Sequence, residues 1–276
     1  MKPRKAISSI LGHAMLAGMS LLFIIPFLWL VLTSLKSDAE IFSRGLRWLP
    51  EQPLWSNYRE AIEYIPFFRY LANTLFICLC AVLGAVFSCS LVAYGFSRIR
   101  WFGRDVLFFV LLSTMMITGM VTMIPVFRIF RRLGWIGTFL PLIVPSFLGA
   151  PFFIFLLRQF FLGIPRALSE AAILDGCSEF SIYARIILPL AKPALLTVAL
   201  FTFLWNWNDF MGPLIYLTDN SKYTLAVGLQ QFLGQHDAEW SQLMAISTLM
   251  TLPVIVLFFF TQKTFVKGIA LTGLKG

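Results

Sequence analysis

The sequence predicts an all-α integral membrane protein with six transmembrane helices. Of its 276 residues, 59% are hydrophobic and only 13% are charged, whereas about 25% of the residues of soluble domains are charged. The chain also contains six apolar runs, each near the roughly 20 residues that a helix needs to cross a hydrocarbon core of about 30 Å. These runs cover residues 14–35, 71–96, 106–127, 136–157, 193–217 and 243–261.

The first apolar run is expected to remain as a membrane span. Lys2, Arg4 and Lys5 precede it, as basic residues precede a signal peptide. The run is nevertheless too long for a signal-peptide core, and no convincing small-residue cleavage site follows it.

The distribution of basic residues favours cytoplasmic termini. With this orientation nine of the 22 Lys and Arg residues lie outside, which leaves 13 inside. The net charge of +9 is therefore explained by basic loops beside anionic lipid, and a nucleic-acid partner is not expected. The nine outside residues are Lys36, Arg44, Arg47, Arg59, Arg69, Arg128, Arg131, Arg132 and Lys222.

The reactive residue types do not form a catalytic or metal-binding pattern. Three of the four cysteines fall in the second span and Cys177 falls in an inside loop, so we expect structural thiols and no disulfide. The two histidines, His13 and His236, are far apart in the sequence. A zinc site, a Ser–His triad and a membrane-embedded enzyme therefore all lack necessary groups.

Two further segments carry interfacial signals. The first outer loop, residues 36–70, contains Trp48 and Trp55, which indicate folding against either the membrane surface or a partner. The second span is rich in small residues, which predicts an interior helix. It leads into the basic and aromatic turn Arg98–Arg104, which we interpret as a membrane-interface turn in preference to a nucleic-acid patch.

The next three spans contain helix-breaking prolines and polar side chains. Pro125, Pro141, Pro145 and Pro151 predict kinks in the third and fourth spans, either for packing or along a transport path. The fifth span contains Asn206, Asn208 and Asp209, followed by Gly212. Because polar groups at membrane depth are costly, we hypothesise that this cluster borders a translocation path or its gate. Interhelical hydrogen bonding is the alternative.

A charged segment, residues 162–192, separates two apolar runs and reads as two short helices. Pro165 fits the first position of a helix over residues 165–174, and Gly176 fits the residue beyond its end. Ser178 can cap a second helix with Glu179 in its first turn. Pro189 should end that helix, with Leu188 extended.

This segment resembles the EAA loop of permease subunits of ATP-binding-cassette importers. The resemblance lies in Glu170-Ala-Ala-Ile-Leu-Asp-Gly176 and in Ile187-Leu-Pro-Leu190. Asn57-Tyr58, the segment Trp205–Pro213 and the closing Gly-Leu-Lys-Gly resemble more narrowly the carbohydrate branch, specifically the six-span partner of maltose-type systems.

The resemblance implies a type I importer permease fold in the cytoplasmic membrane of a bacterium or archaeon. It implies a second, usually different permease subunit, two cytoplasmic ATPase subunits that bind ATP and Mg, and an external solute-binding protein. No cofactor and no catalytic group is expected on this chain. The alternatives are a permease for peptides or another small solute, and a secondary transporter, which usually shows internal repeats.

The EAA loop would then be a coupling hairpin that docks in a groove on one ATPase. Alanines would give a thin face, Glu170 would meet a basic group, and leucines would anchor the helix. Gly176 would permit the sharp turn, and Cys177 departs from the usual alanine or serine. The expected contact residues are Ala167, Leu168, Glu170, Ala171, Ala172, Leu174, Asp175, Gly176 and Cys177. The tail, residues 263–276, is either a frayed end or a second docking segment.

Overall fold

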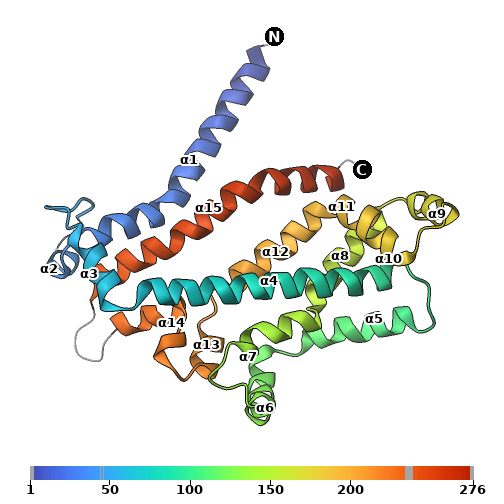
Figure 1. Cartoon of the computed structure of the whole chain (residues 1–276). Helices are drawn as coiled ribbons and strands as arrows, with labels where there is room; N and C mark the ends of the chain where they lie inside the picture. The colour runs from blue at the N-terminus through green and yellow to red at the C-terminus, as the bar shows by residue number, and fades with distance from the viewer. Residues whose placement is uncertain (1–2, 44, 46, 234–238, 274–276) are drawn as a thin grey trace. The chain divides into compact units, whose positions relative to one another are not determined.

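The chain consists of helices that form two compact units. The structure, a computed structural model, describes residues 3–43, 45, 47–233 and 239–273 (Figure 1). Every secondary-structure element assigned in these residues is a helix, as predicted. The first unit comprises residues 1–67 and 228–253, and the second comprises residues 68–227 and 254–276.

The first unit holds the first predicted span and a folded outer loop. Asn57 is buried, and its Nδ2 donates to the carbonyl oxygens of Ser34 at 2.9 Å and Lys36 at 2.8 Å. These bonds satisfy acceptors that the end of α1 would otherwise leave free. The loop is thereby fixed to the end of α1. The elements are α1 (Pro3–Ser34), α2 (Asp38–Ile41), α3 (Ser56–Tyr64), η5 (Gln230–Phe232) and the first part of α15 (Trp240–Gly273).

The second unit holds the longest run of consecutive helices. Its long helices are α4 (Phe67–Ser97), α5 (Arg104–Ser113), α6 (Gly119–Arg132), α8 (Pro151–Gly163), α9 (Arg166–Leu174) and α12 (Lys192–Trp207). Its short helices are η1 (Thr114–Met116), α7 (Leu140–Ile143), η2 (Val144–Leu148), α10 (Glu179–Ile182), η3 (Tyr183–Ile187), α11 (Leu188–Leu190), α13 (Met211–Tyr216) and η4 (Asn220–Lys222). Helix α14 (Leu225–Leu229) lies at the boundary of the two units.

Helix α4 is the interior helix of its unit, in agreement with its small-residue pattern. Ala81, Ala85, Cys89 and Ala93 are all buried and recur every four residues, so they form one stripe along the helix. A Cβ atom added at Gly84 would lie only 2.5 Å from the ring of Phe147. The absence of a side chain at Gly84 therefore permits η2 to approach α4 closely.

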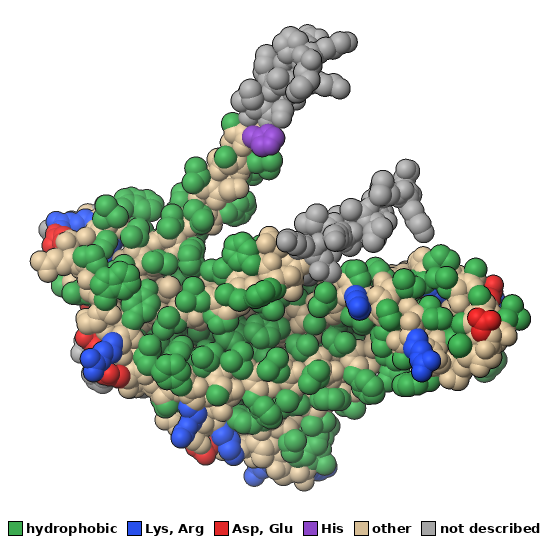
Figure 2. Space-filling view, turned by 45° about the horizontal axis from the view of Figure 1, so that its top comes forward, with side chains coloured by type: hydrophobic (Ala, Val, Ile, Leu, Met, Phe, Trp, Pro, Cys, Tyr) green, Lys and Arg blue, Asp and Glu red, His purple; other side chains and the backbone are tan. Residues whose placement is uncertain are grey.

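The exposed surface is strongly apolar over the visible face (Figure 2). Within the described residues four helices are long and apolar enough to cross a membrane, or six if each of two bent helix pairs counts as one span. The most apolar stretch of α4 is 44% buried, whereas the corresponding stretches of the other three candidate spans are 22% buried or less. The remaining apolar surface is what lipid or partner subunits would cover.

The third predicted span, residues 106–127, contains a sharp bend. The α5–η1 segment and α6 meet at an angle of 99°. The break lies at Ile117 and Thr118, whose ψ angles of 114° and 134° are extended, and Gly119, a poor helix former, follows. Pro125, which was expected to cause the kink, lies inside α6.

The fourth and fifth predicted spans are also interrupted. In the segment 136–157, helix begins at Leu140, Gly149 with a φ of +86° separates η2 from α8, and α8 continues to Gly163. In the segment 193–217, α12 ends at Trp207 and α13 begins at Met211. The prolines of the fourth span predicted kinks there, whereas the break after Trp207 in the fifth span was not predicted, because it depends on side chains that bond their own backbone.

The last predicted span, residues 243–261, lies within the much longer α15. The helix continues through most of the predicted tail 263–276, to Gly273, and the last three residues of the tail lie outside the described residues.

Candidate functional site

The segment 162–192 forms the predicted helix, tight turn and helix. Gly176 has a φ of +77°, a conformation that a residue with a Cβ atom adopts at a cost of about 1–2 kcal/mol. The Cys177 amide donates to the Ala172 carbonyl at 2.9 Å, which is the bond that closes a Schellman motif. Pro165 precedes α9 with an extended ψ of 133°, so the predicted start of this helix is one residue too early.

The second helix of the hairpin begins where predicted and ends later. Ser178 accepts a hydrogen bond from the Ser181 amide at 3.3 Å and caps α10. The helix then continues through the π-helical turn η3 and through α11 to Leu190. Leu188 is helical, with φ −59° and ψ −46°, so the predicted end at Pro189 is wrong. Pro189 directly follows the π-helical turn η3, whose altered hydrogen-bond register accommodates it within the helix.

Eight of the nine predicted coupling residues are exposed. Leu174, at the end of α9, is 89% exposed, and Leu168 is 44% exposed. Ala172 instead is 7% exposed and belongs to the core of the unit, so the predicted three-alanine face is reduced to Ala167 and Ala171. The exposed residues are Ala167, Leu168, Glu170, Ala171, Leu174, Asp175, Gly176 and Cys177.

Two exposed apolar residues near the turn of the hairpin were missed from the sequence. Ile173 is 53% exposed and Phe180 is 69% exposed. Both lie near the turn at Gly176. Large apolar side chains beside a glycine turn, in an otherwise charged segment, could have indicated this exposure from the sequence. Together with Leu174 they make the tip of the hairpin apolar.

Two tyrosines join α10 and η3 to α4. The Tyr94 hydroxyl donates to Glu179 Oε2 at 2.5 Å, and the hydroxyls of Ser90 and Tyr183 are 2.7 Å apart. The two tyrosine rings meet edge to face with their centroids 5.3 Å apart. Sequence reasoning placed Glu179 at a helix start but gave it no partner, because such pairing across 85 residues has no local signal.

The base of the hairpin is fixed by Arg98, which follows α4. Its Nη2 donates to the carbonyl oxygens of Phe161 at 2.6 Å and Ile164 at 2.7 Å, both at the C-terminal end of α8. Burial and the nearby charge of Arg166 lower the pKa of Arg98. The segment that enters the hairpin is therefore held against the end of α4.

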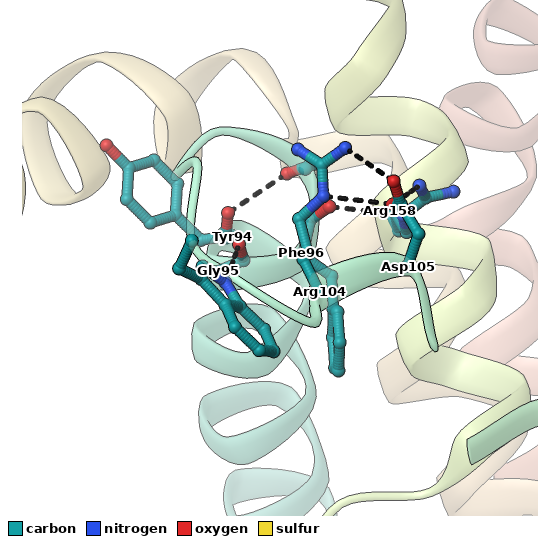
Figure 3. A network of polar contacts seen from close by, with 8 residues as sticks. Tyr94, Gly95, Phe96, Arg104, Asp105 and Arg158 are labelled. Carbon is teal, nitrogen blue, oxygen red and sulfur yellow. Dashed lines mark hydrogen bonds and ion pairs between the residues drawn. The ribbon is translucent and has the colours of Figure 1, made fainter. Parts of the chain in front are cut away.

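Beside this base, Arg104, Asp105 and Arg158 converge (Figure 3). Arg104 Nε lies 3.0 Å and Arg158 Nη2 lies 3.7 Å from Asp105 Oδ1. Arg158 also donates to the Phe96 carbonyl at 3.2 Å. The ends of α4 and α8 and the start of α5 are thus connected by polar contacts.

The predicted path residues lie together at the break between α12 and α13. Asn206, Asn208 and Asp209 line a cavity of about 650 Å³ with Phe201, Leu204 and Trp205. Both asparagine amides donate to carbonyls four residues earlier at 2.8 Å. Asp209 Oδ1 accepts from the Gly212 amide at 3.0 Å. These local bonds compete with a regular helix, which explains the break.

Trp205 gives this cavity an aromatic wall. The indole is 53% exposed, and its ring stacks on Phe153 with centroids 4.9 Å apart. A Cβ atom at Gly212 would lie 2.4 Å from Asp209 Oδ2, so Gly212 leaves the space that this carboxylate occupies. The cavity combines two aromatic side chains, Phe201 and Trp205, with three polar ones.

All four cysteines are free thiols. Among the residues that the structure describes, no three His, Cys, Asp or Glu side chains gather in a way that could hold a metal ion.

The family model of the inner membrane component of binding-protein-dependent transport systems matches residues 81–271. The chain belongs to this family. The hairpin, its contacts with α4 and the cavity at α12 all lie within the match. The chain is therefore a multi-pass inner membrane permease component of an ATP-binding-cassette transporter that works with a binding protein, and it is not itself catalytic.

Similar permeases cover nearly the whole chain. An arabinooligosaccharide transport permease of Bacillus subtilis is 34% identical over 94% of this chain and 92% of its own length. A polygalacturonan/rhamnogalacturonan transport permease of the same organism is 30% identical over 96% of each chain. The crystal structure of a bacterial transporter that imports the acidic polysaccharide alginate matches with a TM-score of 0.81 and 27% identity, over 96% of this chain and 99% of that chain.

Proposed function

We propose that this permease is a transmembrane subunit of an ATP-driven importer of sugars or oligosaccharides. The similar transporters are named for arabinooligosaccharides, polygalacturonan or rhamnogalacturonan, and alginate, which supports a carbohydrate over a peptide or another small solute. Thermal stabilisation of the matching external binding protein by a panel of sugars tests this class. Stabilisation by peptides alone would contradict it.

The hairpin is proposed to dock on an ATPase subunit. The observation that carries this proposal is the exposed apolar tip around Leu174, on a hairpin whose second helix is bonded to α4. An apolar tip in water is unfavourable unless a partner covers it. Ala167 and Ala171, one turn apart on α9, provide a face of small side chains for a groove.

The mechanism that follows is a transfer of motion from the ATPases to the membrane helices. Closure of two cytoplasmic ATPase subunits on ATP would move the hairpin, and the Tyr94 and Tyr183 contacts would carry that motion to α4. Inverting a 1:99 population of inward-facing and outward-facing states takes roughly 5.5 kcal/mol, which ATP bound in only one state can supply. The cavity lined by Asn206, Asn208 and Asp209, with Gly212 beside Asp209, would border the path or its gate.

The assembly is proposed to contain a second, different permease subunit, and both termini of this chain would be cytoplasmic. A broken helix with polar groups beside an open cavity fits half of a path that a second subunit completes. Cysteine-accessibility scanning at positions 206, 208 and 209 tests whether these residues border the path. Labelling from lipid at all three positions, with no protection by substrate, would overturn this assignment.

Docking is tested by co-purification of the ATPase with the tagged permease. Leu174→Asp should remove the ATPase from the purified complex, because it places a charge in the apolar contact. Leu49→Asp is the matched control, since Leu49 is 71% exposed in the outer loop, and it should retain the ATPase. Uptake and stimulated ATP hydrolysis that both survive the double variant Glu170→Lys with Gly176→Asp would contradict the coupling role.

A further inference from the structure

The turn between α4 and α5 forms a basic pocket that neither the hairpin contact nor the transport path uses. The pocket has a volume of about 490 Å³. Three arginines line it, from the turn (Arg100), from the start of α5 (Arg104) and from the start of α9 (Arg166). The other lining residues are Trp101, Gly103, Asp105 and Val106.

The pocket has an excess of positive charge. Asp105 is its single acidic lining residue, and Arg104 and Arg158 already flank that carboxylate at 3.0 Å and 3.7 Å. Among the described residues no ion pair engages Arg100 or Arg166. Two guanidinium groups are therefore available to an anion, and guanidinium groups bind phosphate by paired N–H donors.

The position of the turn indicates the source of that anion. Residues 98–103 connect a candidate span that ends at Ser97 with one that begins at Arg104, which places them at the depth of lipid headgroups. Phe102 is fully exposed, and Trp101 is 39% exposed. Apolar and aromatic side chains are stable in that position when they reach the acyl chains below the headgroups.

We propose that this pocket binds the phosphate of an anionic phospholipid, with Arg100 and Arg166 as its ligands and Phe102 inserted beside the acyl chains. Arg166 opens the helix that carries the coupling hairpin, and Arg98 fixes that helix's base through Ile164. The lipid would therefore sit beside the hairpin and support its position. Binding itself does not depend on the proposed transport function.

The test uses the intact complex in nanodiscs of phosphatidylcholine with increasing phosphatidylglycerol, and measures the bound phosphatidylglycerol by native mass spectrometry. Each arginine near an anionic surface contributes about fivefold in affinity, so Arg100→Gln with Arg166→Gln should raise the half-saturating phosphatidylglycerol fraction about 25-fold. The matched control, Arg185→Gln with Lys192→Gln, removes two exposed charges outside the pocket and should change little.

An equal shift in both double variants would overturn the proposal, because it would indicate general surface attraction only. Binding of inorganic phosphate by the complex in phosphatidylcholine nanodiscs, with no preference for phosphatidylglycerol, would also overturn it and would identify a site for free phosphate. Phe102→Ser gives a second measurement with the arginines intact, since a fully exposed side chain is not needed for folding. It should weaken lipid retention, and unchanged retention would exclude the inserted geometry.

Discussion

The contact between Ser90 and Tyr183 allows the join between the hairpin and α4 to be tested quantitatively. Both residues are buried, at 1% and 4% exposed, and their hydroxyls are 2.7 Å apart. Ser90 Oγ also donates to the Phe87 carbonyl at 3.1 Å, so in this arrangement it accepts from Tyr183. Ser90→Ala therefore leaves the Tyr183 hydroxyl buried without an acceptor, whereas Tyr183→Phe leaves Ser90 bonded to Phe87.

The two single variants should consequently differ in cost. Ser90→Ala should lower the free energy of unfolding by about 1–3 kcal/mol, and Tyr183→Phe should lower it by less. The double variant should be less destabilising than the sum of the two single variants, with a coupling energy between about 0.6 kcal/mol, the average for interhelical hydrogen bonds in membranes, and about 1.7 kcal/mol, the maximum. The assay is equilibrium unfolding of the four proteins of this double-mutant cycle in mixed micelles. Strict additivity would refute the assignment of a direct bond.

Three other substitutions test separate contacts. Gly84→Val should lower the folded yield, because its side chain would meet Phe147, and Phe147→Ala should restore part of it, as size-exclusion profiles would record. Asn57→Leu should lower the melting temperature, because it leaves two carbonyls of the α1 end without donors and costs about 1–3 kcal/mol; an unchanged temperature would contradict this. Gly176→Val should cost at least about 1–2 kcal/mol and uncouple ATP hydrolysis from uptake while the complex still assembles, whereas normal coupling would contradict the turn's role.

The sequence was sufficient for the features that depend on composition and local chemistry. Apolar composition predicted an all-helical chain, and Ser178 and Gly176 predicted the cap and the turn that the structure contains. The order of small residues in α4 correctly indicated an interior helix. Each of these depends on a residue and its near neighbours along the chain.

The features that sequence reasoning missed depend on distant residues or on competing local bonds. The burial of Ala172 follows from packing against the core of its unit, which helix periodicity alone does not fix. The Tyr94–Glu179 bond joins helices 85 residues apart in sequence. The continuation of the helix past Pro189 required the π-helical turn η3, and the break after Trp207 required side chains that bond their own backbone.

Site-specific photo-crosslinking at the hairpin tip tests the central claim most directly. A photoreactive amino acid at position 174, which is 89% exposed, should give an ATP-dependent adduct with the ATPase subunit in the assembled importer. The same group at position 59, whose side chain is 82% exposed in the outer loop, should give none. Adducts at position 174 with lipid alone, or equal ATPase adducts at both positions, would contradict the coupling role of the hairpin.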